Sequence, residues 1–125
     1  MRDRPCLACP TGLSDLERLP RCDDVPVIDS LAAALGCMYV LEGSSLGGRI
    51  ITRHVRAKLG ITEETGGRFF HGYGEQTGEM WRAFRASVSA CPVTLAARET
   101  MVEAAIATFR LLRRWCEREG PRSLQ

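Results

Sequence analysis

The sequence has little net charge, only two histidines and no long hydrophobic run. Its 17 Lys and Arg against 15 Asp and Glu leave a formal net charge of +2, whereas nucleic-acid binding needs a concentrated basic patch. The longest apolar stretch, residues 31–41, is interrupted by Gly36 and is shorter than the roughly 20 residues of a membrane-spanning helix. No basic segment followed by an apolar segment opens the chain, as a secretory signal would. We therefore expect a cytoplasmic protein without nucleic-acid or membrane partners.

Six cysteines are present, but their pattern does not predict a disulfide framework, which is typical of short secreted chains. Only Cys6 and Cys9, with Cys22 further on, have a metal-like spacing. Tetrahedral zinc needs four ligands, and no second Cys-x-x-Cys or nearby histidine completes the set. We expect no metal site and interpret the pair as a chance occurrence in a loose arm, with a structural zinc or a redox pair as the alternative.

A chain of 125 residues and 13.8 kDa is long enough for one hydrophobic core and too short for two, so a single domain is expected over residues 1–125. Residues 1–26 hold four of the six prolines and predict an irregular N-terminal arm. One short helical piece is expected there, because Leu13, Leu16 and Leu19 follow the spacing i, i+3, i+6. The helical core is expected over residues 27–119.

Hydrophobic spacing predicts three longer helices. The first runs from about residue 31 to 59, with Asp29 or Ser30 as its N-cap and Gly60 as its C-cap. The second runs from about 75 to 90 and the third from about 95 to 119, with Pro92 between them. Thr62 is expected to cap a brief turn. No segment alternates with a period of two for long enough to form a strand, so the expected fold class is all-α.

The apolar spacing also predicts which faces are buried. The second helix is expected to bury Met80 or Trp81 with Phe84 and Val88. The inner stripe expected for the third helix consists of Val102, Ala105, Phe109, Leu112 and Cys116.

The first predicted helix contains three glycines within six residues, Gly43, Gly47 and Gly48, and these destabilise it. Each glycine in a helix interior is unfavourable by about 1 kcal/mol relative to alanine, so the three together cost about 3 kcal/mol. Close packing of two helix backbones would compensate for this cost. The alternative is a flat ligand lying against the helix backbone, where a Cβ would collide with it. Sequence alone leaves both readings open.

Three motifs occur in order along the chain: YVLEGSSLGG at residues 39–48, FFHGYG at 69–74 and TGEMWRAF at 77–84. Together they resemble the biliverdin-producing heme oxygenases, in particular the bacterial branch that is often paired with phytochromes. The resemblance extends from about Leu13 to Glu119. It implies a heme-oxygenase-like helical bundle and the oxidative cleavage of heme to biliverdin, carbon monoxide and ferrous iron. Heme would be both substrate and cofactor, and O2 and an external electron donor would be consumed.

The same resemblance implies a set of site residues on the glycine-rich helix. Gly43, Ser44 and Gly47 would be the catalytic positions, with Ser44 and backbone groups close to the iron-bound oxygen or its ordered water. Gly43, Gly47 and Gly48 would also lie over the porphyrin. Taken without the resemblance, Ser44 would be expected to bond back to a helix carbonyl.

Two further heme-binding residues follow from the resemblance. Arg85 would meet a heme propionate, with Arg82 as the fallback, and Phe109 would form an aromatic wall on the last helix. Taken without the resemblance, Arg85 is a solvated helix arginine and Phe109 a core residue.

Family members are about half as long again, and their extra length precedes the match as a helix with the iron-ligating histidine. We therefore expect an N-terminally truncated version of the bundle. His54 is interpreted as a surface or packing residue and His71 as a turn residue. The alternatives to an enzyme are a non-catalytic heme-binding or helical interaction remnant, with self-association through the exposed face, and another helical-bundle enzyme with a different ligand.

Overall fold

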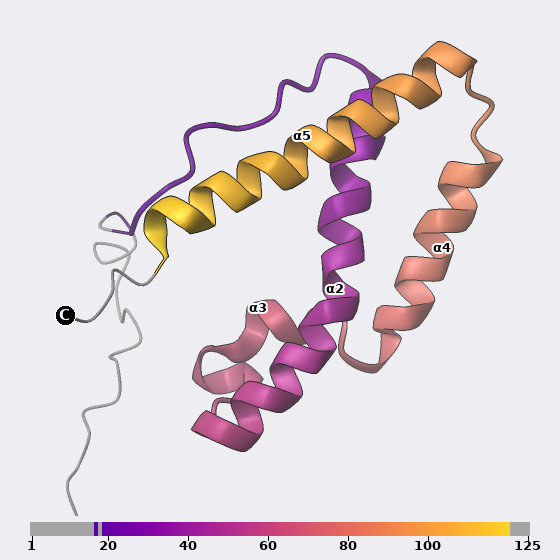
Figure 1. Ribbon diagram of the computed structural model, residues 1–125. Helices are drawn as coiled ribbons and strands as arrows, with labels where there is room; N and C mark the ends of the chain where they lie inside the picture. The colour runs from indigo at the N-terminus through magenta and orange to yellow at the C-terminus, as the bar shows by residue number, and fades with distance from the viewer. Residues whose placement is uncertain (1–16, 18, 121–125) are drawn as a thin grey trace, which may run out of the picture.

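The computed structural model describes residues 17 and 19–120, and within them every regular element is helical (Figure 1). The long helices are α2 (Leu31–Leu59), α4 (Thr77–Ala90) and α5 (Leu95–Glu119). Between α2 and α4 lie a kinked turn, η1 (Glu63–Gly67), in which Thr65 and Gly66 depart from helical backbone angles, a short helix, α3 (Arg68–His71), and a 3-10 turn, η2 (Gly74–Gln76). The expected all-α fold class is confirmed. The Cys6–Cys9 pair and most of the short helical piece at residues 13–19 lie outside the described residues.

The helix ends form where the sequence places their caps. Ser30, rather than Asp29, is the N-cap of α2, and its Oγ accepts a hydrogen bond of 3.1 Å from the Ala33 N–H. Gly60 ends the same helix in the left-handed conformation, with φ of 67°, which a residue with a Cβ rarely adopts. The second predicted helix begins slightly late, because residues 74–76 form the 3-10 turn before α4 starts at Thr77.

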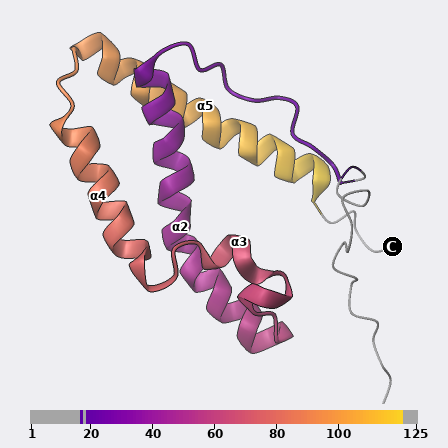
Figure 2. The ribbon, with the colours of Figure 1, turned by 180° about the vertical axis from the view of Figure 1, so that it is seen from behind.

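Helix α2 is the central element: α5 crosses it near its first turns, α4 runs beside its middle, and α3 lies against its second half (Figures 1 and 2). The crossing with α5 is very close, since a Cβ at Gly36 would collide with the Met101 carbonyl and lie 2.9 Å from the Ala104 Cβ. The buried residues of α2 beside Gly36 are small or medium-sized, namely Ala33, Cys37 and Val40. Small side chains therefore allow the two backbones to approach.

The inner stripe predicted for α5 is wrong by about one position. Val102 and Phe109 are each 58% exposed and Leu112 is 43% exposed. Cys116 is exposed as well, and only Ala105 of that set is half-buried. The side chains that face inward are Met101, Ala104, Thr108, Leu111 and Trp115. Apolar residues occupy two adjacent stripes of α5, so a helical period alone cannot tell which stripe packs against α2.

The face expected for α4 is largely confirmed, with Trp81 rather than Met80 as its first member. Trp81, Phe84 and Val88 are half-buried, whereas Met80 is 40% exposed. The rings of Trp81 and Phe84 stack with centroids 5.9 Å apart. These aromatic side chains give α4 its contact with α2.

Residues 19–29 form neither helix nor strand and run beside α5 (Figures 1 and 2). An ion pair of 3.1 Å joins Asp24 to Arg114 of α5. Among helices of the described part of the chain, none is long and apolar enough to cross a membrane.

Candidate functional site

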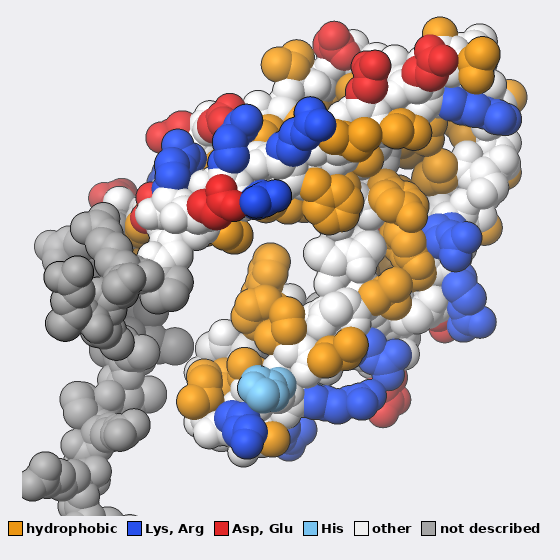
Figure 3. Space-filling view, in the orientation of Figure 1, with side chains coloured by type: hydrophobic (Ala, Val, Ile, Leu, Met, Phe, Trp, Pro, Cys, Tyr) orange, Lys and Arg blue, Asp and Glu red, His pale blue; other side chains and the backbone are white. Residues whose placement is uncertain are grey.

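Two adjoining hollows lie in the angle that α2 makes with α4 and α5. The first, of about 360 Å³, is bordered by Tyr39, Val40, Gly43, Ser44, Leu46, Gly47, Trp81 and Phe109. The second, of about 400 Å³, is bordered by Leu35, Gly36, Tyr39, Val88, Met101, Val102, Ala105, Ile106 and Phe109. Tyr39 and Phe109 border both hollows, which therefore lie side by side, and we call the two together the apolar trough. Figure 3 shows hydrophobic side chains gathered along α5 where it passes α2. Small-molecule sites commonly have volumes of about 300–1,000 Å³.

The glycines of α2 divide between the two explanations that the sequence left open. A Cβ at Gly48 would lie 2.6 Å from the Phe70 carbonyl oxygen, so this glycine allows α3 to pack against α2. A Cβ at Gly43 would lie 3.3 Å from the Trp81 ring, a tight contact with α4. At Gly47, in contrast, nothing lies within 4 Å of a Cβ. Helix packing therefore accounts for Gly48 and in part for Gly43, and it does not account for Gly47.

Ser44 borders the trough, but its hydroxyl proton is already used within the helix. Its Oγ donates to the Leu41 carbonyl at 2.6 Å, and Ser45 donates in the same way to the Glu42 carbonyl at 2.5 Å. This is the back-bonding expected of a serine inside a helix. The lone pairs of the Ser44 oxygen remain able to accept a hydrogen bond from a molecule in the trough.

Aromatic side chains form the walls of the trough. Tyr39 of α2 and Trp81 of α4 have ring centroids 5.2 Å apart, in a tilted arrangement. Phe109 closes the opposite side from α5 and leaves most of its ring exposed. Tyr39 and Trp81 belong to the sequence motifs but were not predicted as site residues. Their signal is helical spacing, because Tyr39 precedes Gly43 by four residues and therefore shares its face.

The arginines expected near a ligand do not border the trough. Arg85 is an exposed residue of α4. Arg82, the fallback, directs its Nε to the Gly78 carbonyl of its own helix at 3.3 Å. The structure therefore brings together Gly43, Ser44, Gly47 and Phe109, and it leaves Gly48 and Arg85 outside their shared hollow.

Neither histidine borders the trough. His71, at the end of α3, has its Nδ1 2.9 Å from Glu63 Oε2, and His54 is an exposed residue of α2. Among the described residues, no group of three or more His, Cys, Asp and Glu side chains is arranged to hold a metal ion.

A hydrogen bond anchors the turn after α3 to the residue that precedes Gly43. The Tyr73 hydroxyl lies 3.0 and 3.1 Å from the two carboxylate oxygens of Glu42 and donates to them. This bond, together with the negative charge of Glu42, raises the pKa of Tyr73 above its usual value. The glycine-rich part of α2 is thus tied to the chain segment that leads into α4.

These features define an all-helical protein with an apolar, aromatic-walled trough beneath a glycine-bearing helix. The sequence model of the heme oxygenase family matches residues 13–118, most of the chain. The protein therefore belongs to the heme oxygenase family, and the resemblance seen in the three motifs is confirmed at that level. Searches of curated proteins and of solved structures gave no match.

Proposed function

We propose that this chain is a heme oxygenase of the bacterial, phytochrome-associated type that binds heme in the apolar trough. The reaction proposed is the oxidative cleavage of heme to biliverdin, carbon monoxide and ferrous iron, with O2 and an external electron donor as the other reactants. The observation that carries the proposal is the open space at Gly47. A glycine that is unfavourable in a helix and touches nothing needs an explanation outside the packing of this chain.

The residues around the trough suit a flat, largely apolar ligand. Tyr39, Trp81 and Phe109 offer ring faces and edges, and the exposed parts of these side chains lose contact with water when a ligand covers them. Gly47 presents bare backbone, so a planar ring can approach α2 closely. Bound heme supplies the iron at which oxygen is activated.

The proposed roles of the chain's own residues follow from their positions. Gly47 leaves room for the ring plane, whereas the space beside Gly43 is filled by the Trp81 ring, so Gly43 contributes by letting that aromatic wall pack against α2. Ser44 accepts a hydrogen bond from ordered water through its free lone pairs. Phe109 limits movement of the ring within its plane. Gly48 contributes by letting α3 pack against α2. Arg85, which is exposed on α4 and does not border the trough, would meet only a propionate that projects beyond the trough into solvent.

A heme titration of the purified chain, followed by the Soret band, tests heme binding. Addition of ascorbate in air then tests turnover through the appearance of biliverdin absorbance. A saturable change of the Soret band from that of free heme is expected. A broad spectrum of free heme contradicts the proposal, and a sharp band that does not decay limits it to heme binding.

Gly47→Leu is the variant that tests the assignment of the trough, because its side chain would occupy the proposed plane of the ring. We expect it to abolish heme binding. Gly78→Leu on α4 is the matched control, since a Cβ at Gly78 also meets nothing within 4 Å and Gly78 does not border the trough. Equal heme affinity in the two variants would contradict the assignment of the trough as the heme site.

A second candidate, a non-catalytic interaction module, is favoured by one specific observation. The α5 residues that border the trough include Val102, Ile106 and Phe109, which are 44–58% exposed. Contiguous apolar surface of this kind is typical of protein interfaces. In this alternative a second copy of the chain covers the trough, and self-association takes the place of heme binding.

A further inference from the structure

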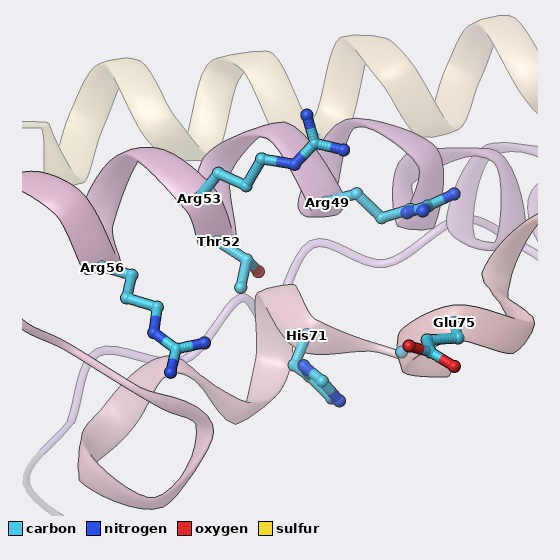
Figure 4. A pocket seen from close by; sticks show the side chains of 7 residues that line it. Arg49, Thr52, Arg53, Arg56, His71 and Glu75 are labelled. Carbon is cyan, nitrogen blue, oxygen red and sulfur yellow. The ribbon is translucent and has the colours of Figure 1, made fainter.

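A second, polar pocket lies on the far half of α2, away from the apolar trough (Figure 4). It has a volume of about 220 Å³ and is bordered by Arg49, Thr52, Arg53, Arg56, His71, Gly74 and Glu75. An adjoining hollow of about 280 Å³ shares Thr52, Arg56 and His71 with it. Neither the sequence motifs nor the proposed heme site uses these residues as ligand contacts.

The arginines of this pocket are concentrated by the sequence. Residues 43–62 contain no Asp or Glu, and Arg49, Arg53 and Arg56 follow the spacing i, i+4, i+7, which places them on one face of α2. Like charges at such spacings destabilise a helix by about 0.2–0.5 kcal/mol per pair. An anion bound between them would remove this repulsion.

The acidic residues near the pocket offset this charge only in part. Glu75 borders it directly, and Glu64 borders the adjoining hollow. Glu63 also borders the adjoining hollow, but its carboxylate is engaged by the His71 ring at 2.9 Å. Three arginines and one carboxylate without an ion-pair partner among the described residues, that of Glu75, therefore border the first pocket.

Thr52 provides an independent sign of a missing partner. Its Oγ1 is shielded from solvent and has no hydrogen-bond partner among the described residues. A threonine inside a helix usually donates to a preceding carbonyl, as Thr108 does to the Ala104 carbonyl at 2.8 Å. Figure 4 shows the Thr52 oxygen on the side of the open space above His71. Rotation of the Thr52 side chain toward the pocket would bring this shielded hydroxyl to an oxyanion there, which would give it an acceptor.

The floor of the pocket is fixed in place. The contact with Glu63 orients the His71 ring, and Gly74 leaves room for it, because a Cβ at Gly74 would lie 2.9 Å from His71 Nε2. Gly74 also has a φ of 60°, a conformation that favours glycine. The arginines of α2 therefore line one side of the pocket, and the turn that carries His71 lines the other.

We propose that this pocket binds a phosphate-type oxyanion, either free phosphate or the phosphate group of a small ester. Guanidinium groups match the geometry of phosphate oxygens and can donate two hydrogen bonds at once, and the Thr52 hydroxyl supplies a further donor. The site is independent of heme, so its test does not depend on the proposed function.

The probe is inorganic phosphate, titrated by calorimetry into the full chain at constant ionic strength and compared with chloride. We expect saturable binding with a Kd of about 1 mM or tighter. Arg53→Ala and Thr52→Val are each expected to weaken binding, by about tenfold for the arginine because a charge-assisted hydrogen bond is lost. Arg110→Ala on α5 is the control, since it removes the same charge outside the pocket.

Three outcomes would overturn the proposal: no saturable binding, an equal loss in Arg53→Ala and Arg110→Ala, or chloride competing as well as phosphate. Circular dichroism of each variant separates lost binding from lost folding. If Thr52→Val unfolds the chain, Thr52→Ser is tested instead. It keeps the hydroxyl, and the proposal requires that its affinity for phosphate is unchanged. Repeating the titration with a phosphate monoester distinguishes the two sources of the anion.

Discussion

At the level of single residues, the glycines of α2 have different environments and should respond differently to the same substitution. Gly47→Ala adds a Cβ where nothing lies within 4 Å, so the variant should gain about 0.5–1 kcal/mol of stability from helix propensity. Gly48→Ala places its Cβ 2.6 Å from the Phe70 carbonyl and should lose about 1–3 kcal/mol. Urea denaturation measures both values. A destabilised Gly47→Ala protein would show that the space at the Cβ position of Gly47 is not open.

The Tyr73–Glu42 hydrogen bond predicts a change at alkaline pH. The pKa of Tyr73 is raised in the folded chain, so the folded state holds this proton more tightly than the unfolded state does. The stability that the bond contributes is fully present below pH 10 and is lost as the pH rises through the raised pKa. In a Tyr39→Phe background Tyr73 is the only tyrosine, and ultraviolet absorbance follows its ionisation. Glu42→Gln should lower the measured pKa, and an unchanged value would show that the bond is absent in solution.

At the level of whole helices, α5 offers two neighbouring leucines of different burial. Leu111 is 9% exposed and Leu112 is 43% exposed. Leu111→Ala should therefore cost about 2–3 kcal/mol, and Leu112→Ala about 1 kcal/mol or less. Chemical denaturation of the two variants tests which stripe of α5 packs against α2. A larger loss at Leu112 would restore the stripe predicted from the sequence.

The helices and most of the buried face of α4 were predictable from local signals, whereas the buried face of α5 was not. Ser30, Gly60 and Pro92 act within a few residues of their own positions, and so the ends of the long helices follow from the sequence. Burial depends instead on what the neighbouring helix presents. The sequence shows Gly36 only as an interruption of an apolar run, yet at this residue the α5 backbone leaves no room for a Cβ.

The candidate site was predictable only in part, for a similar reason. Gly43, Ser44, Gly47 and Phe109 share a hollow as the family resemblance implied. Gly48 belongs to the same sequence motif, but its contact is with Phe70, and no local pattern distinguishes it from Gly47. Arg85 follows the aromatic motif in sequence, yet α4 presents it to solvent rather than to the trough.

At the level of the whole molecule, the open trough predicts competition between heme and self-association. Apolar side chains that α5 leaves exposed, Phe109 among them, would be covered either by heme or by a second copy. Sedimentation velocity should show a mass that rises with protein concentration and falls when heme is added. Phe109→Ser should reduce self-association, and Arg110→Ser is the control because it changes a neighbouring exposed residue. If heme does not change the mass, heme binding and self-association use different surfaces, and the predicted competition is contradicted.

The close crossing at Gly36 holds α2 and α5 together near the N-terminal end of α2. Gly47 lies eleven residues beyond Gly36, about 16 Å along the axis of α2 at 1.5 Å per residue. A rotation of only about 5° at the crossing would move Gly47 by about 1.5 Å. A larger side chain at Gly36 is therefore expected to change the width of the trough, although Gly36 lies about three helical turns from the glycine that the ligand would meet.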